Sequence, residues 1–269
     1  MQTIGIVAEY NPFHCGHQYH IAQSKLQCPE ADGIIAVMSG NFTQRGEPAI
    51  FDKWTRTKAA LQGGADLVLE LPTAFATRSA GYFARGAVLT LAATGIVSHL
   101  SCGVENTPQQ DIAYTLQQIA ALLADEPEPY REALQHSIGE GMAYPQARQK
   151  ALQELHISGA ELLDTPNNIL ALEYCIALQE RNSSMSILPI KREGGGYHDT
   201  GLDKSVFASA TAIRQLLEKT IGNENTCNNS LLSTELKDHL PEAVYSILAK
   251  KENKYITQND FSSLLHYKL

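Results

Sequence analysis

The chain opens with a short apolar run that stops at a turn and two histidines, and this order strongly constrains the fold. Thr3-Ile-Gly-Ile-Val-Ala8 is followed by Glu-Tyr-Asn-Pro-Phe-His14-Cys-Gly-His17. A buried strand, a tight turn and a helix start in this order form the first unit of a Rossmann-like sheet. A helix N-terminus has unpaired N–H groups and a partial positive charge, so it favours phosphate. We therefore predict that ATP binds here through its phosphates.

The side chains of this turn suit a phosphate site. Gly16 has no Cβ, so the backbone can approach a ligand closely. His14 and His17 lie three residues apart, and both can donate hydrogen bonds to charge that develops on the α- and β-phosphates. We expect this cradle to be cationic.

Two alternatives remain open for these histidines. With His20, they are spaced like a metal-binding face of a helix, although the acidic residue of a His-Glu-x-x-His motif is missing. They can also be incidental polar groups of a structural turn. We favour the phosphate site and predict neither zinc nor another metal on the protein.

Composition limits the class of protein. A length of 269 residues with 43% apolar residues suits one large or two small domains. The five cysteines are scattered without a Cys-x-x-Cys pair, which indicates reduced thiols and a cytoplasmic protein. We expect neither export nor a membrane span, because no signal peptide pattern and no long apolar run occurs. The net charge of -8 disfavours non-specific nucleic-acid binding, so an RNA substrate needs a local basic patch.

The pattern of the opening repeats along the chain. Apolar runs at Gly33–Ser39, Ala65–Pro72 and Val97–Gly103 predict strands, and helical patterns lie between them at Phe51–Leu61 and Gly81–Ala93. Repeated βα units predict an α/β fold with a parallel, doubly wound sheet that binds ligands at the carboxyl ends of its strands. Candidate site residues follow these ends at Asn11–His17, Ser39–Arg45, Leu71–Ser79 and Gly103–Asn106.

The rest of the chain predicts two helical additions to this core. Strand patterns stop near Pro108, and they resume with a strand at Ser186–Lys191 between helices at Asn167–Glu180 and Ser209–Lys219. The tail is polar at first, then helical, and stops inside an apolar run, so we expect it to be incomplete. The predicted parts are an α/β core at residues 1–106 and 167–219, a helical insertion at 107–166 and a helical C-terminal extension at 220–269.

A second group of polar residues lies late in the chain. Ser209 and Thr211 begin a predicted helix, and Arg214 lies one turn further, so the three can clamp a β- or γ-phosphate. Arg192 closes a predicted strand just before three glycines. The alternatives are an ordinary helix cap with an exposed arginine, and a surface charge before a linker. Asn167, at another helix start, is by default a capping residue.

Together these segments resemble a known family. The pairing of His14-Cys-Gly-His17 with Ser209-Ala-Thr-Ala-Ile-Arg214 resembles the HxGH nucleotidyltransferase superfamily. Longer segments look like those of the bacterial tRNA(Met) cytidine acetate ligases: Val7–His14, Ser39–Pro48, Gly64–Pro72, Pro166–Leu170 and Lys191–His198. The resemblance covers nearly the whole chain. It implies that ATP activates acetate to an acetyl-adenylate, with release of pyrophosphate, and that the acetyl group passes to N4 of the wobble cytidine, C34, of elongator tRNA(Met).

The resemblance also implies site residues. ATP contacts would fall on Val7, Ala8, Glu9, Tyr10, Asn11, Pro12, Phe13, His14, Cys15, Gly16, His17, Gln18, Tyr19, His20, Gly103, Asn167 and Arg192. Cys15 departs from the asparagine usual in the family. From the residues themselves we add Ser209 and Thr211 as ATP contacts and assign catalytic roles to His14, His17 and Arg214. The basic residues Arg45, Lys53, Arg56 and Arg78 are candidate tRNA contacts, and the alternative is a solvated face.

The implied reaction asks the protein mainly for positioning and electrostatics. We expect Mg²⁺ to bind the β- and γ-phosphates with water, since no carboxylate cage is visible in the sequence. Members of the family ordinarily extend beyond the equivalent of Leu269, which implies that tRNA docking depends on that further region. Two other functions remain open: an adenylyltransferase for a phosphorylated metabolite, and a nucleotide-binding regulatory module without catalysis.

Overall fold

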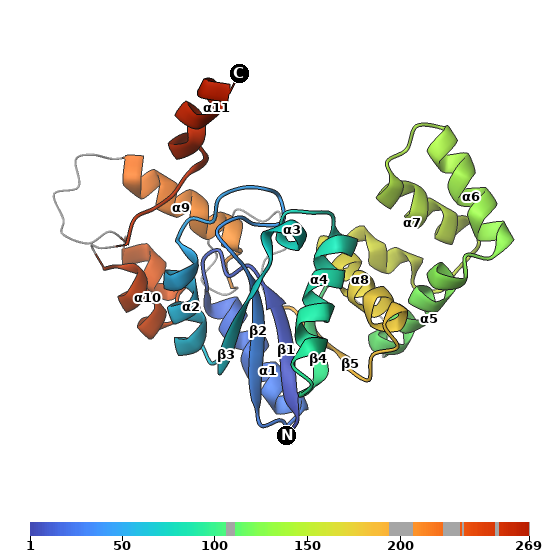
Figure 1. Ribbon diagram of the computed structural model, residues 1–269, viewed down its shortest axis with the longest axis horizontal. Coiled ribbons are helices and arrows are strands. Elements are labelled where there is room, and N and C mark those ends of the chain that lie inside the picture. The colour runs from blue at the N-terminus through green and yellow to red at the C-terminus, as the bar shows by residue number, and fades with distance from the viewer. Residues whose placement is uncertain (106–110, 194–206, 223–231, 233, 251–252, 269) are drawn as a thin grey trace.

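One parallel sheet organises the molecule, in the part of the chain that the computed structural model describes: residues 1–105, 111–193, 207–222, 232, 234–250 and 253–268. Its strands are β1 (Thr3–Ala8), β2 (Gly33–Ser39), β3 (Leu67–Leu71), β4 (Val97–Val104) and β5 (Ser186–Lys191). Their order is β3-β2-β1-β4-β5 (Figure 1). The predicted α/β class and parallel sheet are therefore confirmed.

The order of the strands decides where a ligand can bind. The chain passes from β1 outward to β2 and β3, then crosses to the other side of β1 to build β4 and β5. β1 thus pairs with β2 on one side and with β4 on the other. In such a sheet the connections leave β1 and β4 in opposite directions, which opens a crevice at their carboxyl ends.

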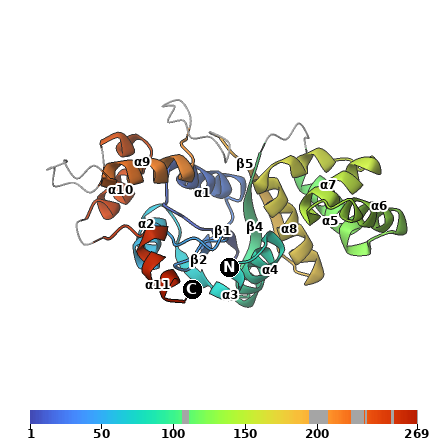
Figure 2. The same ribbon diagram turned by 90° about the horizontal axis from the view of Figure 1, so that it is seen from above.

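Helices cover both faces of the sheet, because successive apolar side chains of β2 point to opposite faces and both sets are buried. Ile34, Ala36 and Met38 belong to one buried cluster, together with side chains of α1 (Cys15–Gln27), α2 (Lys53–Gln62), α9 (Ala210–Gly222) and α10 (Glu242–Leu248). Ile35 and Val37 belong to the other cluster, with α4 (Ala80–Ala93), which follows the short α3 (Thr73–Ala76), and with α8 (Pro166–Glu180). Successive side chains of a strand point to opposite faces, so a continuous apolar run fits between two helical layers (Figure 2).

The helical insertion extends the second cluster. It contains α5 (Ile112–Asp125), α6 (Glu128–Gly139), α7 (Tyr144–Glu154) and a 3₁₀ turn at Ala160–Asp164. Leu116 and Ile119 of α5 are buried in the same cluster as Leu172 of α8. A nearly buried ion pair between Arg148 of α7 and Glu173 of α8, 2.6 Å long, makes a further connection. The insertion therefore shares its core with one face of the sheet.

The C-terminal extension is less regular than the sequence predicts. Instead of long helices it has 3₁₀ turns at Thr234–Asp238 and Gln258–Phe261, with α10 between them and α11 (Ser262–Lys268) at the end. Pro241 is the N-cap of α10, because its fixed φ suits a helix start. Leu236, Leu240 and Val244 are buried in the cluster that contains α2. The extension therefore completes the core on the face of α1 and α2. No helix of the described residues is long and apolar enough to cross a membrane.

Candidate functional site

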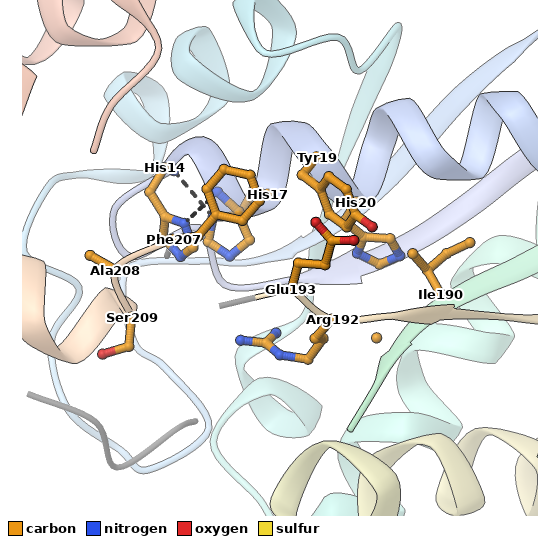
Figure 3. A pocket seen from close by; sticks show the side chains of 12 residues that line it. His14, His17, Tyr19, His20, Ile190, Arg192, Glu193, Phe207, Ala208 and Ser209 are labelled. Carbon is orange, nitrogen blue, oxygen red and sulfur yellow. Dashed lines mark hydrogen bonds between the residues drawn. The ribbon is translucent and has the colours of Figure 1, made fainter. Parts of the chain in front are cut away.

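An open pocket lies at the carboxyl edge of the sheet, where the strand order opens the crevice. His14, His17 and His20 line it from the start of α1, and Gly103 and Arg192 line it from the ends of β4 and β5 (Figure 3). The start of α9 closes it with Ser209.

The first turn of α1 fixes the two motif histidines. His14 is the N-cap, and its Nδ1 accepts a hydrogen bond of 3.0 Å from the N–H of Gly16. The Nδ1 of His17 accepts one of 3.2 Å from the N–H of His14, so the two side chains form a capping box. An Nδ1 that accepts carries no proton, and each neutral ring therefore holds its proton on Nε2. Each histidine keeps one N–H donor for a ligand.

Burial keeps both rings uncharged. It lowers the pKa of His14 to about 3, and the nearby Arg192, Arg214 and His239 act in the same direction. The pKa of His17 is also lowered, mainly by burial and then by His14. Because the ring centroids are 3.8 Å apart, two positive charges would repel strongly. The expectation that these histidines are cationic is therefore corrected: their lowered pKa values leave both rings neutral near pH 7.

His20 belongs to a closed hydrogen-bond network with Ser101 and Ser24. Its Nε2 lies 2.8 Å from Ser101 Oγ, which lies 2.7 Å from Ser24 Oγ. Ser24 donates its hydroxyl proton to the carbonyl of His20, so Ser101 must donate to Ser24 and accept from His20. His20 thus has its proton on Nε2, and burial lowers its pKa to about 4.

Two glycines of the pocket, Gly16 and Gly103, leave room for neighbouring side chains to lie close to the backbone. A Cβ on Gly16 would lie 2.9 Å from Cε1 of His14. A Cβ on Gly103 would lie 3.1 Å from Cγ of Arg192. The close approach predicted for Gly16 is thus made to the capping histidine, and Gly103 makes room for the arginine in the same way.

Arg192 supplies positive charge to the pocket. Its Nε pairs with Glu105 Oε1 at 3.4 Å, and its main-chain N–H donates to the carbonyl of Val104 at 2.9 Å. Burial lowers its pKa, and Glu105 opposes this shift. The predicted ATP contact Asn167 donates its side-chain N–H to the same oxygen of Glu105. Figure 3 shows the guanidinium of Arg192 between the α1 side chains and Ser209.

Of the polar residues Ser209, Thr211 and Arg214, only Ser209 lines the pocket. Ser209 lines the pocket, and its Oγ also accepts from the N–H of Ala212 as a helix cap. Arg214 donates to the main-chain carbonyl of Asn11 at 2.8 Å and to Thr211 Oγ1 at 3.1 Å. Neither Arg214 nor Thr211 is among the pocket-lining residues. Arg214 therefore ties α9 to the turn after β1, and its catalytic role stays a prediction.

The predicted ATP contacts fall into two groups, those that line the pocket and those that do not. Those that line the pocket are His14, Gly16, His17, Tyr19, His20, Gly103, Arg192 and Ser209. Val7, Ala8, Glu9, Tyr10, Asn11, Pro12, Phe13, Cys15, Gln18 and Asn167 are not among the lining residues. Two of these hold the segment after β2: Asn11 Oδ1 accepts from the N–H of Ile50, and Glu9 Oε1 from the N–H of Gln44, both at 2.8 Å.

Four lining residues are absent from the predicted contacts: Ile190, Glu193, Phe207 and Ala208. Each lies within two residues of Arg192 or Ser209 in the sequence, so strand ends and helix starts were the available signal. Phe207 stacks on Tyr19 with ring centroids 5.4 Å apart. The glycine loop at residues 194–196, Asn106 and the predicted linker Asn223–Ser230 lie outside the described residues.

The candidate tRNA contacts differ in accessibility. Arg56 is fully buried and donates to the main-chain carbonyls of Glu9, Ser39, Gly40 and Phe51. Its prediction as an RNA contact is therefore wrong, because its donors hold the protein backbone. Lys53 is paired with Glu70 at 2.6 Å. Arg45 and Arg78 are exposed, and the guanidinium of Arg78 lies 3.8 Å from the centre of the Tyr82 ring.

Within the described residues, the histidines of the pocket form no grouping of metal ligands; the one such grouping is Cys28, Glu30 and His99, near the end of α1 and the start of β4. The Nδ1 atoms of His14 and His17 are used by main-chain N–H groups. These two rings are therefore arranged as donors on the helix start.

The sequence is similar to curated proteins along its length. The tRNA(Met) cytidine acetate ligase of Syntrophomonas wolfei is 46% identical over 240 residues, which are 87% of this chain and 56% of that protein. The ligase of Clostridium novyi is 39% identical over 100% of this chain and 64% of its own length. The chain thus spans 56% and 64% of the lengths of these two relatives.

Solved structures share the fold. Thermotoga maritima TmcAL bound with alpha-thio ATP superposes with a TM-score of 0.77 at 38% identity, over 92% of this chain and 55% of that one. The apo form superposes with a TM-score of 0.80 at 40% identity, over 92% and 56%. The resemblance predicted from the motifs is confirmed. Residues 1–269 match the HIGH Nucleotidyl Transferase family, and with the HxGH pocket at the carboxyl edge of its sheet the chain belongs to that family.

Proposed function

We propose that this chain binds ATP in the pocket, activates acetate as acetyl-adenylate and passes the acetyl group to N4 of C34 in elongator tRNA(Met). The observation that carries the proposal is the meeting of His14, His17 and Arg192 at one edge of the sheet. Neutral imidazole N–H donors, a guanidinium and the partial positive charge of a helix start together suit a triphosphate. The similarity to named tRNA(Met) cytidine acetate ligases supports the substrate assignment.

In the first step a carboxylate oxygen of acetate attacks the α-phosphorus of ATP. The bond from the α-phosphorus to the bridging oxygen breaks, and pyrophosphate leaves with its electron pair. Negative charge accumulates on the phosphate oxygens in the transition state. The Nε2–H groups of His14 and His17 are held in place by the capping box, so they can stabilise this charge without reorganisation. Arg192 binds the leaving phosphates.

In the second step N4 of cytidine attacks the acetyl carbonyl, AMP leaves, and the nitrogen loses a proton. The target cytidine must leave its stack to reach the adenylate. Mg²⁺ bound to the β- and γ-phosphates with water would neutralise charge on ATP. Among the candidate tRNA contacts, Arg45 and Arg78 retain exposed side chains for the RNA backbone.

Radiolabelled acetate tests the proposal. The protein is incubated with acetate, ATP and an elongator tRNA(Met) transcript, and a matched transcript with uridine at position 34 serves as the control. Any ATP-dependent label should be confined to the first transcript. Label in both transcripts, or transfer without ATP, would contradict the proposed function.

A further inference from the structure

Glu105, which follows the end of β4, is a charged group beside the pocket with several partners. Its carboxylate is nearly buried, with 13% of the side chain exposed. Oε1 accepts from Asn167 at the start of α8 and pairs with Nε of Arg192 just after β5. One oxygen atom therefore meets side chains from two other elements at the edge of the site.

The backbone of Glu105 is itself fixed. Asn168, which is 1% exposed, accepts from the N–H of Glu105 at 2.8 Å through Oδ1 and donates to its carbonyl at 3.0 Å through Nδ2. A side-chain amide that bonds both groups of one residue replaces a strand partner beyond the end of β4. The carboxylate is thus presented from a rigid position rather than from a free loop.

This arrangement sets the direction of Arg192. Its Nε forms the ion pair with Glu105 at 3.4 Å, and no partner for its terminal nitrogens is found among the described residues. A guanidinium is a planar fork of donors, so a charge that holds its Nε side favours one direction for the two terminal groups. Figure 3 shows them directed into the space between the α1 side chains and Ser209.

We propose that Glu105 is a positioning residue for ATP: it orients Arg192, and with it Asn167, toward the bound nucleotide. The inference rests on the proposed ATP site. It makes a prediction opposite to simple electrostatics, since removing a carboxylate near a triphosphate should strengthen binding if Glu105 only repels the ligand or neutralises the arginine.

The test uses E105Q, R192A and the double variant, with ATP affinity measured by titration calorimetry. Glutamine keeps an oxygen that can accept from Asn167 and removes the charge that holds Arg192. We expect E105Q to raise the Kd for ATP about 10-fold, a loss of about 1.4 kcal/mol, because the opposite charge that orients Arg192 is gone. In the R192A background the same substitution should change the Kd by less than about twofold, because its target is gone.

E180Q is the matched control. Glu180 ends α8 and pairs with Arg85, so the variant also removes a carboxylate from an arginine ion pair, but outside the pocket lining. It should leave the Kd unchanged. Equal or tighter ATP binding by E105Q, or an undiminished effect in the R192A background, overturns the inference alone. Wild-type protein that binds no ATP overturns the proposed function together with it.

Discussion

His14 and His17, at the start of α1, have two roles: they cap the helix and they present N–H donors to the pocket. Their Nδ1 atoms satisfy main-chain N–H groups that a helix start leaves unpaired. Because those bonds fix both tautomers, the Nε2–H groups are set before a ligand arrives. Neutral rings also avoid the repulsion that two imidazolium ions would feel at a centroid distance of 3.8 Å. The cap of the helix therefore prepares the chemistry of the pocket.

Replacing His17 tests this preparation. H17A removes one preorganised donor, so we expect turnover in pyrophosphate release to fall about 100-fold or more. The exposed His136 of α6 offers a control, because H136A alters only a surface pair with Glu140. A turnover of H17A within twofold of the wild-type value would show that this histidine does not stabilise the transition state.

The buried histidines also predict a pH dependence of stability. The pKa of His20 falls from about 6.5 in the unfolded chain to about 4, mainly through burial and then through Arg192. The unfolded state therefore binds a proton below pH 6.5 that the folded state takes up only near pH 4. Stability is full above pH 6.5 and decreases as the pH falls toward 4.

Urea unfolding at pH 8 and pH 5 measures this effect. Wild-type protein should lose about 2 kcal/mol more of its unfolding free energy between these pH values than H20N does. The comparison of pH slopes removes any general destabilisation by the substitution. Equal slopes for the two proteins would mean that His20 does not titrate as its burial requires.

At the scale of elements, Arg56 joins the carboxyl ends of two strands to a helix. Its guanidinium, carried by α2, bonds carbonyls of Glu9 after β1 and of Ser39 and Gly40 at the end of β2. Burial lowers its pKa to about 10, so it stays charged at neutral pH. The loop that follows β2 is held beside the turn that leads to α1.

R56M should therefore be strongly destabilising. The buried carbonyls lose their donor, so we expect the free energy of unfolding in urea to fall by at least about 3 kcal/mol. R85M breaks the exposed pair with Glu180 and should cost less than about 1 kcal/mol. Similar small losses for both variants would show that the carbonyls find other partners.

Strands and helices were predictable where the sequence shows an apolar run or a helix cap. The apolar runs at Gly33–Ser39 and Ser186–Lys191 match β2 and β5. The helix predicted from Phe51 begins instead at Lys53, because Asp52 accepts from the N–H groups of Trp54 and Thr55. That cap was visible in the sequence, whereas the turns of the extension follow from its packing against α2 and have no periodic pattern.

At the scale of the molecule, topology assembles the site from distant segments. The HxGH turn, Gly103, Arg192 and Ser209 meet because β1, β4 and β5 are neighbours and end at one edge. Motifs and strand ends predicted this meeting. The sequence could not predict that the histidines are uncharged or that Arg56 is buried, because both depend on which side chains surround them in the fold. Glu105 carried no motif of its own.

Isotope exchange between pyrophosphate and ATP tests the central claim most directly. The claim is that the HxGH pocket joins acetate to AMP reversibly, so labelled pyrophosphate should enter ATP only when acetate is present. Wild-type protein should show this exchange without tRNA, and H17A should show about 100-fold less. Exchange that does not depend on acetate, or none in protein that binds ATP, would contradict the account.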